Sequence, residues 1–100
     1  MDQEVDKEWT PFPASADIVD KIESIHAVQW YEAGQIFANK PRFTLVTASD
    51  QYGEPRYAAW GQTDGGRYLV VLFVPVEGQE AKVITAREMN DSERRRFQQR

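Results

Sequence analysis

Cysteine is absent from this chain of 100 residues, and histidine occurs once, as His26. The absence of cysteine excludes a disulfide framework, a thiolate zinc site and a cysteine nucleophile. A single histidine excludes a histidine-rich metal site. The sequence also lacks a glycine-rich phosphate loop with a lysine and the usual serine-nucleophile motifs. We therefore expect no metal and no other cofactor, and the residues left for chemistry are one histidine and several arginines.

Long hydrophobic segments are missing as well. The longest apolar run, Tyr68 to Val76, has about half the length that a membrane-spanning helix needs. The start of the chain is acidic and lacks the apolar segment of a secretory signal. We expect a cytoplasmic protein with no membrane contact.

Negative charge is in surplus, but only in one part of the chain. The net charge is −4; residues 1–24 carry −5 and the remaining 76 residues carry +1. A basic surface on the folded part is compatible with this distribution, and the plainer alternative is a solvated surface of mixed charge. The composition, 41% hydrophobic and 28% charged, fits one globular domain with a single core.

The first residues show no periodicity and contain Pro11 and Pro13. We expect residues 1–14 to form an acidic arm, anchored by Trp9 or Phe12, and residues 15–100 to form one domain.

Helical spacing follows Ser15, a plausible N-cap, where Ile18, Ile22 and Ile25 recur at i, i+4 and i+7. A second helix is expected over about 29–38. Alternating strands joined by turn-rich segments come next, and Asn90 with Glu93 predicts a capping box for a last helix. The order predicts an α+β fold with two N-terminal helices, a four-stranded antiparallel meander and a C-terminal helix. The strands are expected at about 43–48, 57–63, 67–74 and 81–87.

Three arginines stand at the ends of the expected strands. Arg56 opens the second strand, Arg67 opens the third, and Arg87 closes the fourth. In a meander, Arg67 and Arg87 fall at the same end of the sheet and Arg56 at the other end. Guanidinium groups suit phosphate because they stay charged and donate a planar fork of hydrogen bonds. The alternative is that these arginines are solvated or paired with Glu54 or Glu88.

Further candidates lie on the helices and in the sheet. His26 lies between the first two helices; histidine suits general acid or base work at neutral pH, although a cap or packing role is the alternative. Arg96 and Arg100 share a face of the last helix and can therefore face one ligand. The alternative is that this helix is simply solvated. Four aromatic residues of the sheet region can stack on unpaired bases or pack in the core, and we expect at least two in the core. These are Tyr52, Tyr57, Trp60 and Tyr68.

Several segments, taken in order, resemble the BrnT family of toxins. Residues 21–28 follow its Lys-x4-His-Gly-Val pattern, with Ala27 in place of the glycine. The most specific part is Ile-Thr-Ala-Arg at 84–87 followed by Glu-Arg-Arg at 93–95. The turn at 76–80 lacks the basic residues that members often carry, which leaves Lys82 there. The resemblance covers Trp9 to Phe97.

The resemblance implies a RelE-like fold and a metal-independent ribonuclease toxin that inhibits translation. It also implies a BrnA-like antitoxin of the ribbon-helix-helix type, which covers the toxin and binds operator DNA, and a toxin–antitoxin heterotetramer. Two alternatives stay open. In the first, the chain is an inactive relative that serves as a protein-interaction module. In the second, it is a small-molecule enzyme or a ligand-binding domain.

Functional residues are carried over from the family position by position. Arg67 and Arg87 would stabilise the charge that develops on the phosphate, and the base is His26 or Glu54. The full catalytic set that the resemblance implies is His26, Glu54, Arg56, Arg67 and Arg87. The residues expected to bind RNA are Lys82, Arg96, Arg100 and Tyr57.

Overall fold

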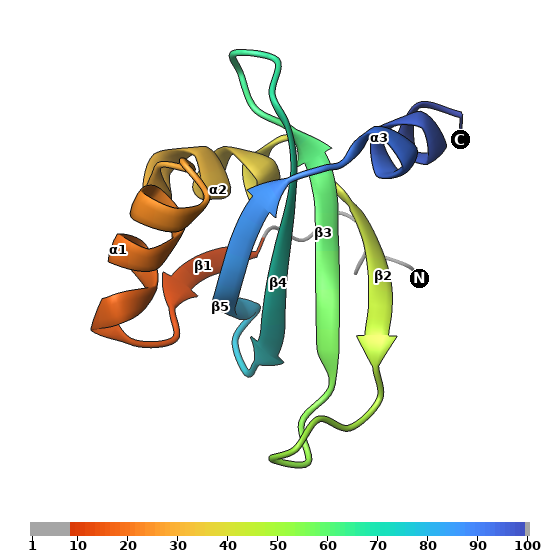
Figure 1. Cartoon of the computed structure of the whole chain (residues 1–100). Helices are drawn as coiled ribbons and strands as arrows, with labels where there is room; N and C mark the ends of the chain where they lie inside the picture. Colours follow the sequence, from red (N-terminus) through yellow and green to blue (C-terminus); the bar gives the residue numbers. More distant parts are fainter. Residues whose placement is uncertain (1–8, 100) are drawn as a thin grey trace.

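Four strands form an antiparallel meander, and a fifth strand joins it at one edge (Figure 1). The structure is a computed structural model that describes residues 9–99. The strands are β1 (Thr10–Pro13), β2 (Arg42–Thr47), β3 (Arg56–Gln62), β4 (Tyr68–Val76) and β5 (Glu80–Glu88). Their spatial order is β1-β5-β4-β3-β2, with β1 parallel to β5 and the other pairs antiparallel.

Three helices accompany the sheet, which confirms the α+β class with two helices before the meander and one after it. They are α1 (Ala16–Ile25), α2 (Trp30–Ala38) and α3 (Asp91–Gln98). Figure 1 shows α1 and α2 together beside the sheet and α3 apart from them. Ser15 is the N-cap of α1, and Asn90 and Glu93 form the capping box of α3, as the sequence predicts.

The prediction of a four-stranded, purely antiparallel sheet is wrong, because the sheet is mixed and has five strands. The extra strand, β1, comes from residues expected in the arm. The backbone N–H groups of Thr10 and Ala14 donate to β5 or the turn before it, each at 2.9 Å. Pro11 and Pro13 fall at the alternate positions, which point away from β5, so their missing N–H groups cost no ladder hydrogen bond.

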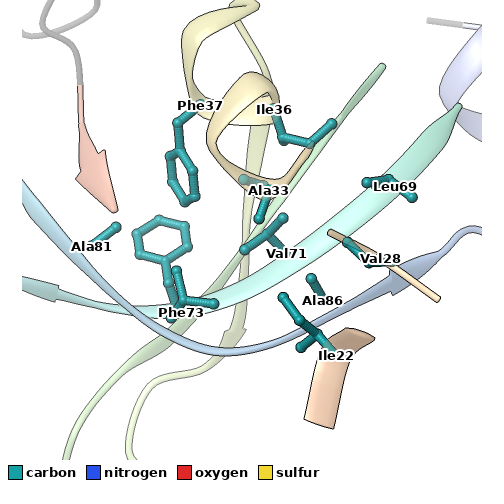
Figure 2. Packing of buried hydrophobic residues seen from close by; sticks show 12 residues of the cluster. Ile22, Val28, Ala33, Ile36, Phe37, Leu69, Val71, Phe73, Ala81 and Ala86 are labelled. Carbon is teal, nitrogen blue, oxygen red and sulfur yellow. The ribbon is translucent and has the colours of Figure 1, made fainter. Parts of the chain in front are cut away.

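The core lies between the sheet and the pair α1 and α2. Leu69, Val71 and Phe73 alternate along β4 and pack with buried side chains of both helices. The rings of Phe37 and Phe73 meet edge to face with centroids 5.2 Å apart, and Ile22 of α1 is fully buried beside β5 (Figure 2). One face of the sheet is therefore committed to packing.

The other face carries the alternate residues, because successive side chains of a strand point to opposite sides. On β4 these are Tyr68, Val70, Leu72 and Val74, and we call this side the open face. Helix α3 lies against one end of it: the Phe97 ring contacts the Tyr68 ring with centroids 6.0 Å apart. No residue of α3 is buried, so the helix covers only part of the open face.

Candidate functional site

The open face carries a row of side chains across four strands at the end near α3. Arg42 of β2 pairs with Trp60 of β3, Trp60 with Val70 of β4, and Val70 with Arg87 of β5. Residues that pair directly across strands point to the same face. We call these four residues the first row; it has a guanidinium at each end and an indole between them.

A charged row also crosses the opposite end of the same face, and we call it the third row. Val74 of β4 pairs with Lys82 of β5. On the other side of β4, Arg56 of β3 lies opposite Val74, because its neighbour Tyr57 pairs with Phe73. An uncharged second row separates the two charged rows. At a rise of about 3.3 Å per residue, the first and third rows are about 13 Å apart. The second row consists of Thr44, Ala58, Leu72 and Thr85.

Carboxylates hold the cations of the third row. Arg56 Nε donates to Asp50 Oδ2 at 3.0 Å, and Lys82 Nζ lies 3.5 Å from Glu54 Oε1. Asp50 also shapes the loop, because its Oδ1 accepts the backbone N–H groups of Tyr52 and Glu54 at 2.8 and 2.9 Å. The hydrogen bond from the Glu54 backbone, with the Tyr52 N–H and Arg56, lowers the pKa of Asp50 in spite of burial. The loop thus positions Glu54 next to Lys82.

Arg87 of the first row makes a two-pronged ion pair with α3. Its two terminal nitrogens donate to the two carboxylate oxygens of Glu93 at 2.8 and 2.9 Å. The hydrogen bonds that Arg87 donates to Glu93 lower the pKa of Glu93 and raise the pKa of Arg87; burial of each group opposes these shifts. The pair fixes the start of α3 to the end of β5.

A hollow of about 90 Å³ opens between α3 and the first row. Arg42 closes one side: its Nη2 donates to the Phe97 carbonyl at 3.0 Å, and its guanidinium carbon lies 5.3 Å from the centre of the Phe97 ring. The residues that line the hollow are Arg42, Thr44, Trp60, Glu93, Arg96 and Phe97.

Arg67 and Arg87 lie at the same end of the sheet, but they point to opposite faces. Arg67 Nη1 donates to Glu32 Oε1 at 2.6 Å and to the Ala27 carbonyl at 3.0 Å, and its Nη2 donates to Glu88 at 2.9 Å. Burial would lower the pKa of Arg67, but Glu88 and Glu32 outweigh it and raise that pKa. Arg67 therefore ties α2 and the α1–α2 turn to β5.

His26 also lies away from the open face. It is the C-cap of α1, and its backbone N–H donates to the Ile22 carbonyl at 3.2 Å. Its neighbour Ala27 accepts the hydrogen bond from Arg67. Of the five predicted catalytic residues, Glu54 and Arg56 lie at one end of the open face, Arg87 lies at its other end, and His26 and Arg67 lie on the helix side.

The residues predicted to bind RNA divide in the same way. Lys82 and Arg96 line the open face or its hollow, whereas Tyr57 stacks on Phe73 with ring centroids 6.0 Å apart and packs at the edge of the core. Arg100 lies outside the described residues. The sequence interpretation missed Arg42, although it opens its strand as Arg56 does. Its pairing with Trp60 depends on register, which no motif reveals.

Arginines on α3 and beside it add positive charge near the first row. Within residues 9–99, four arginines make no ion pair with a carboxylate, and all four lie on α3 or beside it. No group of three or more histidine or acidic side chains in that range is arranged to hold a metal ion. The range also contains no helix that is long and apolar enough to cross a membrane. The four arginines are Arg42, Arg94, Arg95 and Arg96.

Comparison with known proteins gives one family. Residues 20–93 match a family model described as the ribonuclease toxin, BrnT, of a type II toxin–antitoxin system. The match contains β2 to β5 and the start of α3, so it includes all three rows of the open face. A search of curated proteins found no match to the chain.

Proposed function

The chain belongs to the BrnT family of ribonuclease toxins of type II toxin–antitoxin systems, and from this premise we propose that its open face binds single-stranded RNA and cuts it without a metal ion. One observation carries the proposal. Strands β3 and β5, which lie on either side of β4, place Arg56, Lys82 and Arg87 on the face that α1 and α2 leave uncovered. Cations on one face suit a polyanion, because the phosphates supply most of the binding energy.

The third row and the loop before β3 carry a carboxylate and two cations suited to such a cleavage. The ribose 2′-oxygen attacks the adjacent phosphorus, the bond to the 5′-oxygen breaks, the 2′-proton passes to a base, and the leaving 5′-oxygen takes up a proton from water. We assign the base to Glu54, which lies beside Lys82 at the edge of the face. Arg56 and Lys82 would hold the extra negative charge on the phosphate. His26 stays the alternative base, and Arg87 would bind a neighbouring phosphate.

Arg67 has a different role in this proposal. Its three nitrogens donate to groups on α2, the α1–α2 turn and β5. Contact with a phosphate would require breaking two ion pairs. We therefore assign it to holding the helices on the sheet.

The remaining family features belong to the same proposal. We infer a RelE-like fold, inhibition of translation in the cytoplasm, and neutralisation by a BrnA-like antitoxin of the ribbon-helix-helix type. Operator DNA would be bound through the antitoxin, in a heterotetramer with the toxin. The antitoxin partner and the RNA target follow from the family itself.

Cleavage of a labelled single-stranded RNA by the purified chain in excess chelator tests the activity. We expect fragments that end in a 2′,3′-cyclic phosphate, and no cleavage of an RNA whose 2′-hydroxyls are replaced by hydrogen. Loss of a donor to the developing charge costs about 10²-fold in rate, which is the loss expected for Lys82→Ala. Lys21→Ala on the exposed side of α1 removes the same charge away from the site and serves as the control.

Two results would contradict the proposal. Cleavage that stops in chelator would show that a metal is needed. Cleavage by Lys82→Ala and Glu54→Gln at the wild-type rate, with unchanged melting temperatures, would remove the third row from the mechanism.

One observation favours a second candidate, an inactive relative that acts as a protein-interaction module. Each open-face cation of β3 and β5 already has a carboxylate partner within 3.5 Å. RNA would have to compete with these carboxylates. An intact chain that binds its antitoxin, yet neither binds nor cuts RNA at low salt, would establish this candidate instead.

A further inference from the structure

We propose that the hollow beside Trp60 is a binding site for one unpaired nucleobase of the RNA. This inference rests on the proposed function, because it assumes that RNA lies on the open face. It adds a stacking contact at the first row, about 13 Å from the third row at 3.3 Å per residue. The site would therefore hold a base at a distance from the phosphate that is cut.

Trp60 and Phe97 are the aromatic residues that line the hollow, and we assign base stacking to Trp60. Within residues 9–99 its ring contacts no other aromatic ring, whereas Tyr57 stacks on Phe73 and Tyr68 contacts both Phe97 and Arg94. The indole is half-buried and lines the hollow. An indole that is exposed on one side offers a surface on which any base can stack.

A hydrogen bond fixes the plane of this indole. Trp60 Nε1 donates to Thr44 Oγ1 at 2.9 Å. The two residues lie on neighbouring strands, because Arg42 pairs with Trp60 and Thr44 with Ala58. The Thr44 hydroxyl uses a lone pair in this bond and keeps its own proton for an acceptor on the base edge. The indole is thus held in place before a ligand arrives.

Arg42 and Arg96 border the hollow together with one carboxylate, Glu93, which is paired with Arg87. Arg42 donates to the Phe97 carbonyl and stacks on the Phe97 ring, so its position is fixed while its charge meets no carboxylate within residues 9–99. Arg96 is exposed on α3 and its Nη2 lies 3.4 Å from the Ser92 hydroxyl. A nucleotide combines a flat aromatic base with an anionic phosphate, and these residues match both parts.

The test compares two oligonucleotides of equal length and charge. One is a 2′-O-methyl RNA, which cannot be cut because it has no free 2′-hydroxyl, and the other has the same backbone without bases. Affinities are measured by fluorescence anisotropy at two salt concentrations. Base stacking on an aromatic side chain is worth about 1–3 kcal/mol, so Trp60→Leu should weaken binding of the base-containing strand roughly tenfold. It should leave binding of the base-free strand unchanged.

Three control variants accompany Trp60→Leu. Trp30→Leu makes the same substitution on the helix side and should change neither affinity. Trp60→Phe keeps an aromatic ring and should retain most of the preference for bases. Arg96→Ala should weaken both strands alike, because phosphates are common to both. If Trp60→Leu does not fold, Thr44→Val, at an exposed position, replaces it with a smaller expected loss on the base-containing strand.

The outcomes separate this inference from the proposed function. Equal wild-type affinity for the two strands would overturn the base site and leave RNA binding by the open face intact. A preference for bases that survives in Trp60→Leu would place base binding elsewhere and also overturn it. If neither strand binds at low salt, the proposed function fails, and the base site fails with it.

Discussion

Ala27 occupies a backbone conformation that alanine adopts at a cost. Its φ is 56°, in the left-handed region, and its carbonyl accepts a hydrogen bond from Arg67 at 3.0 Å. The left-handed conformation brings Cβ close to the backbone and costs an L-residue about 1–2 kcal/mol, whereas glycine lacks this penalty. The chain therefore carries strain in the turn between α1 and α2.

We expect Ala27→Gly to raise the free energy of unfolding by about 1 kcal/mol, because relief of strain exceeds the extra chain entropy of glycine. In a domain of this size, that corresponds to a melting temperature about 5 °C higher. Differential scanning calorimetry measures it. Ala16→Gly, at an exposed helical position, should instead lower stability by about 0.5–1 kcal/mol. A lower melting temperature for Ala27→Gly would contradict the strain.

Glu93 links stability to pH through its ion pair with Arg87. Its pKa in the folded protein lies below the ordinary value of 4.5, mainly because Arg87 donates to it. In this pH range the unfolded chain binds the proton more readily than the folded chain. The stabilisation is therefore complete above pH 4.5 and is lost as the pH falls through the lowered pKa.

Urea denaturation at several pH values tests this linkage. Wild type should be more stable than Glu93→Gln by about 1 kcal/mol at pH 7, and the difference should shrink as the pH falls from 5 to 3. Glu77→Gln, in the exposed turn before β5, should show no such convergence. A gap between wild type and Glu93→Gln that is the same at pH 3 and pH 7 would show that the pair does not link folding to pH.

At the scale of elements, α3 is held to the sheet by surface contacts. None of its residues is buried, and its start depends on the capping box, in which the Asn90 side chain accepts the Glu93 backbone N–H at 2.8 Å. Loss of such a cap costs about 1 kcal/mol. Because α3 buries no side chain against the sheet, loss of the cap should destabilise this helix locally and leave the stability of the rest of the fold unchanged.

We therefore expect Asn90→Ala to increase amide hydrogen exchange across residues 91–98 while the exchange of β4 amides stays as in wild type. Asn90→Asp keeps an oxygen acceptor at the N-cap and serves as the control. If β4 loses protection together with α3, the helix is part of the cooperative unit, and the argument for its local opening fails.

Most elements were predictable from the sequence because each depends on local patterns. The isoleucine spacing fixed α1, the alternation of residues 43–48 fixed β2, and Asn90 with Glu93 fixed the start of α3. β1 was missed because its two prolines are typical of an arm. Only the parallel partner β5, some 70 residues away in the chain, makes clear that both prolines face away from the ladder.

The candidate site was less predictable because it depends on register and on face. The sequence indicates correctly that Arg67 and Arg87 lie at the same end of the sheet. Their opposite faces follow from the paired residues, Val70 with Arg87 and Leu69 with Glu88. An irregularity in β5 opposite Leu72 and Phe73 shifts the alternation by one residue, and no turn or motif in the sequence announces it.

At the scale of the whole molecule, the two faces of the sheet have separate tasks. One face binds α1 and α2 through an apolar core, and the other presents two charged rows and the hollow beside α3. The net charge of −4 nevertheless opposes RNA at long range. Much of that charge lies in residues 1–8, which carry four acidic side chains and one lysine.

Removal of residues 1–8 should therefore raise RNA affinity at low salt, by about threefold at 50 mM, and the gain should vanish near 0.5 M salt, where charges are screened beyond about 4 Å. The deletion must end before Trp9, because this residue packs on Phe73 and precedes β1. Anisotropy titrations with the uncut 2′-O-methyl strand measure the effect. A full-length variant with Asp2, Glu4 and Asp6 changed to their amides should bind as the deletion does, since both raise the net charge by three and the variant keeps the length. If the deletion alone gains affinity, or if the gain persists in high salt, charge is not the cause, and residues 1–8 compete with RNA for the surface by contact.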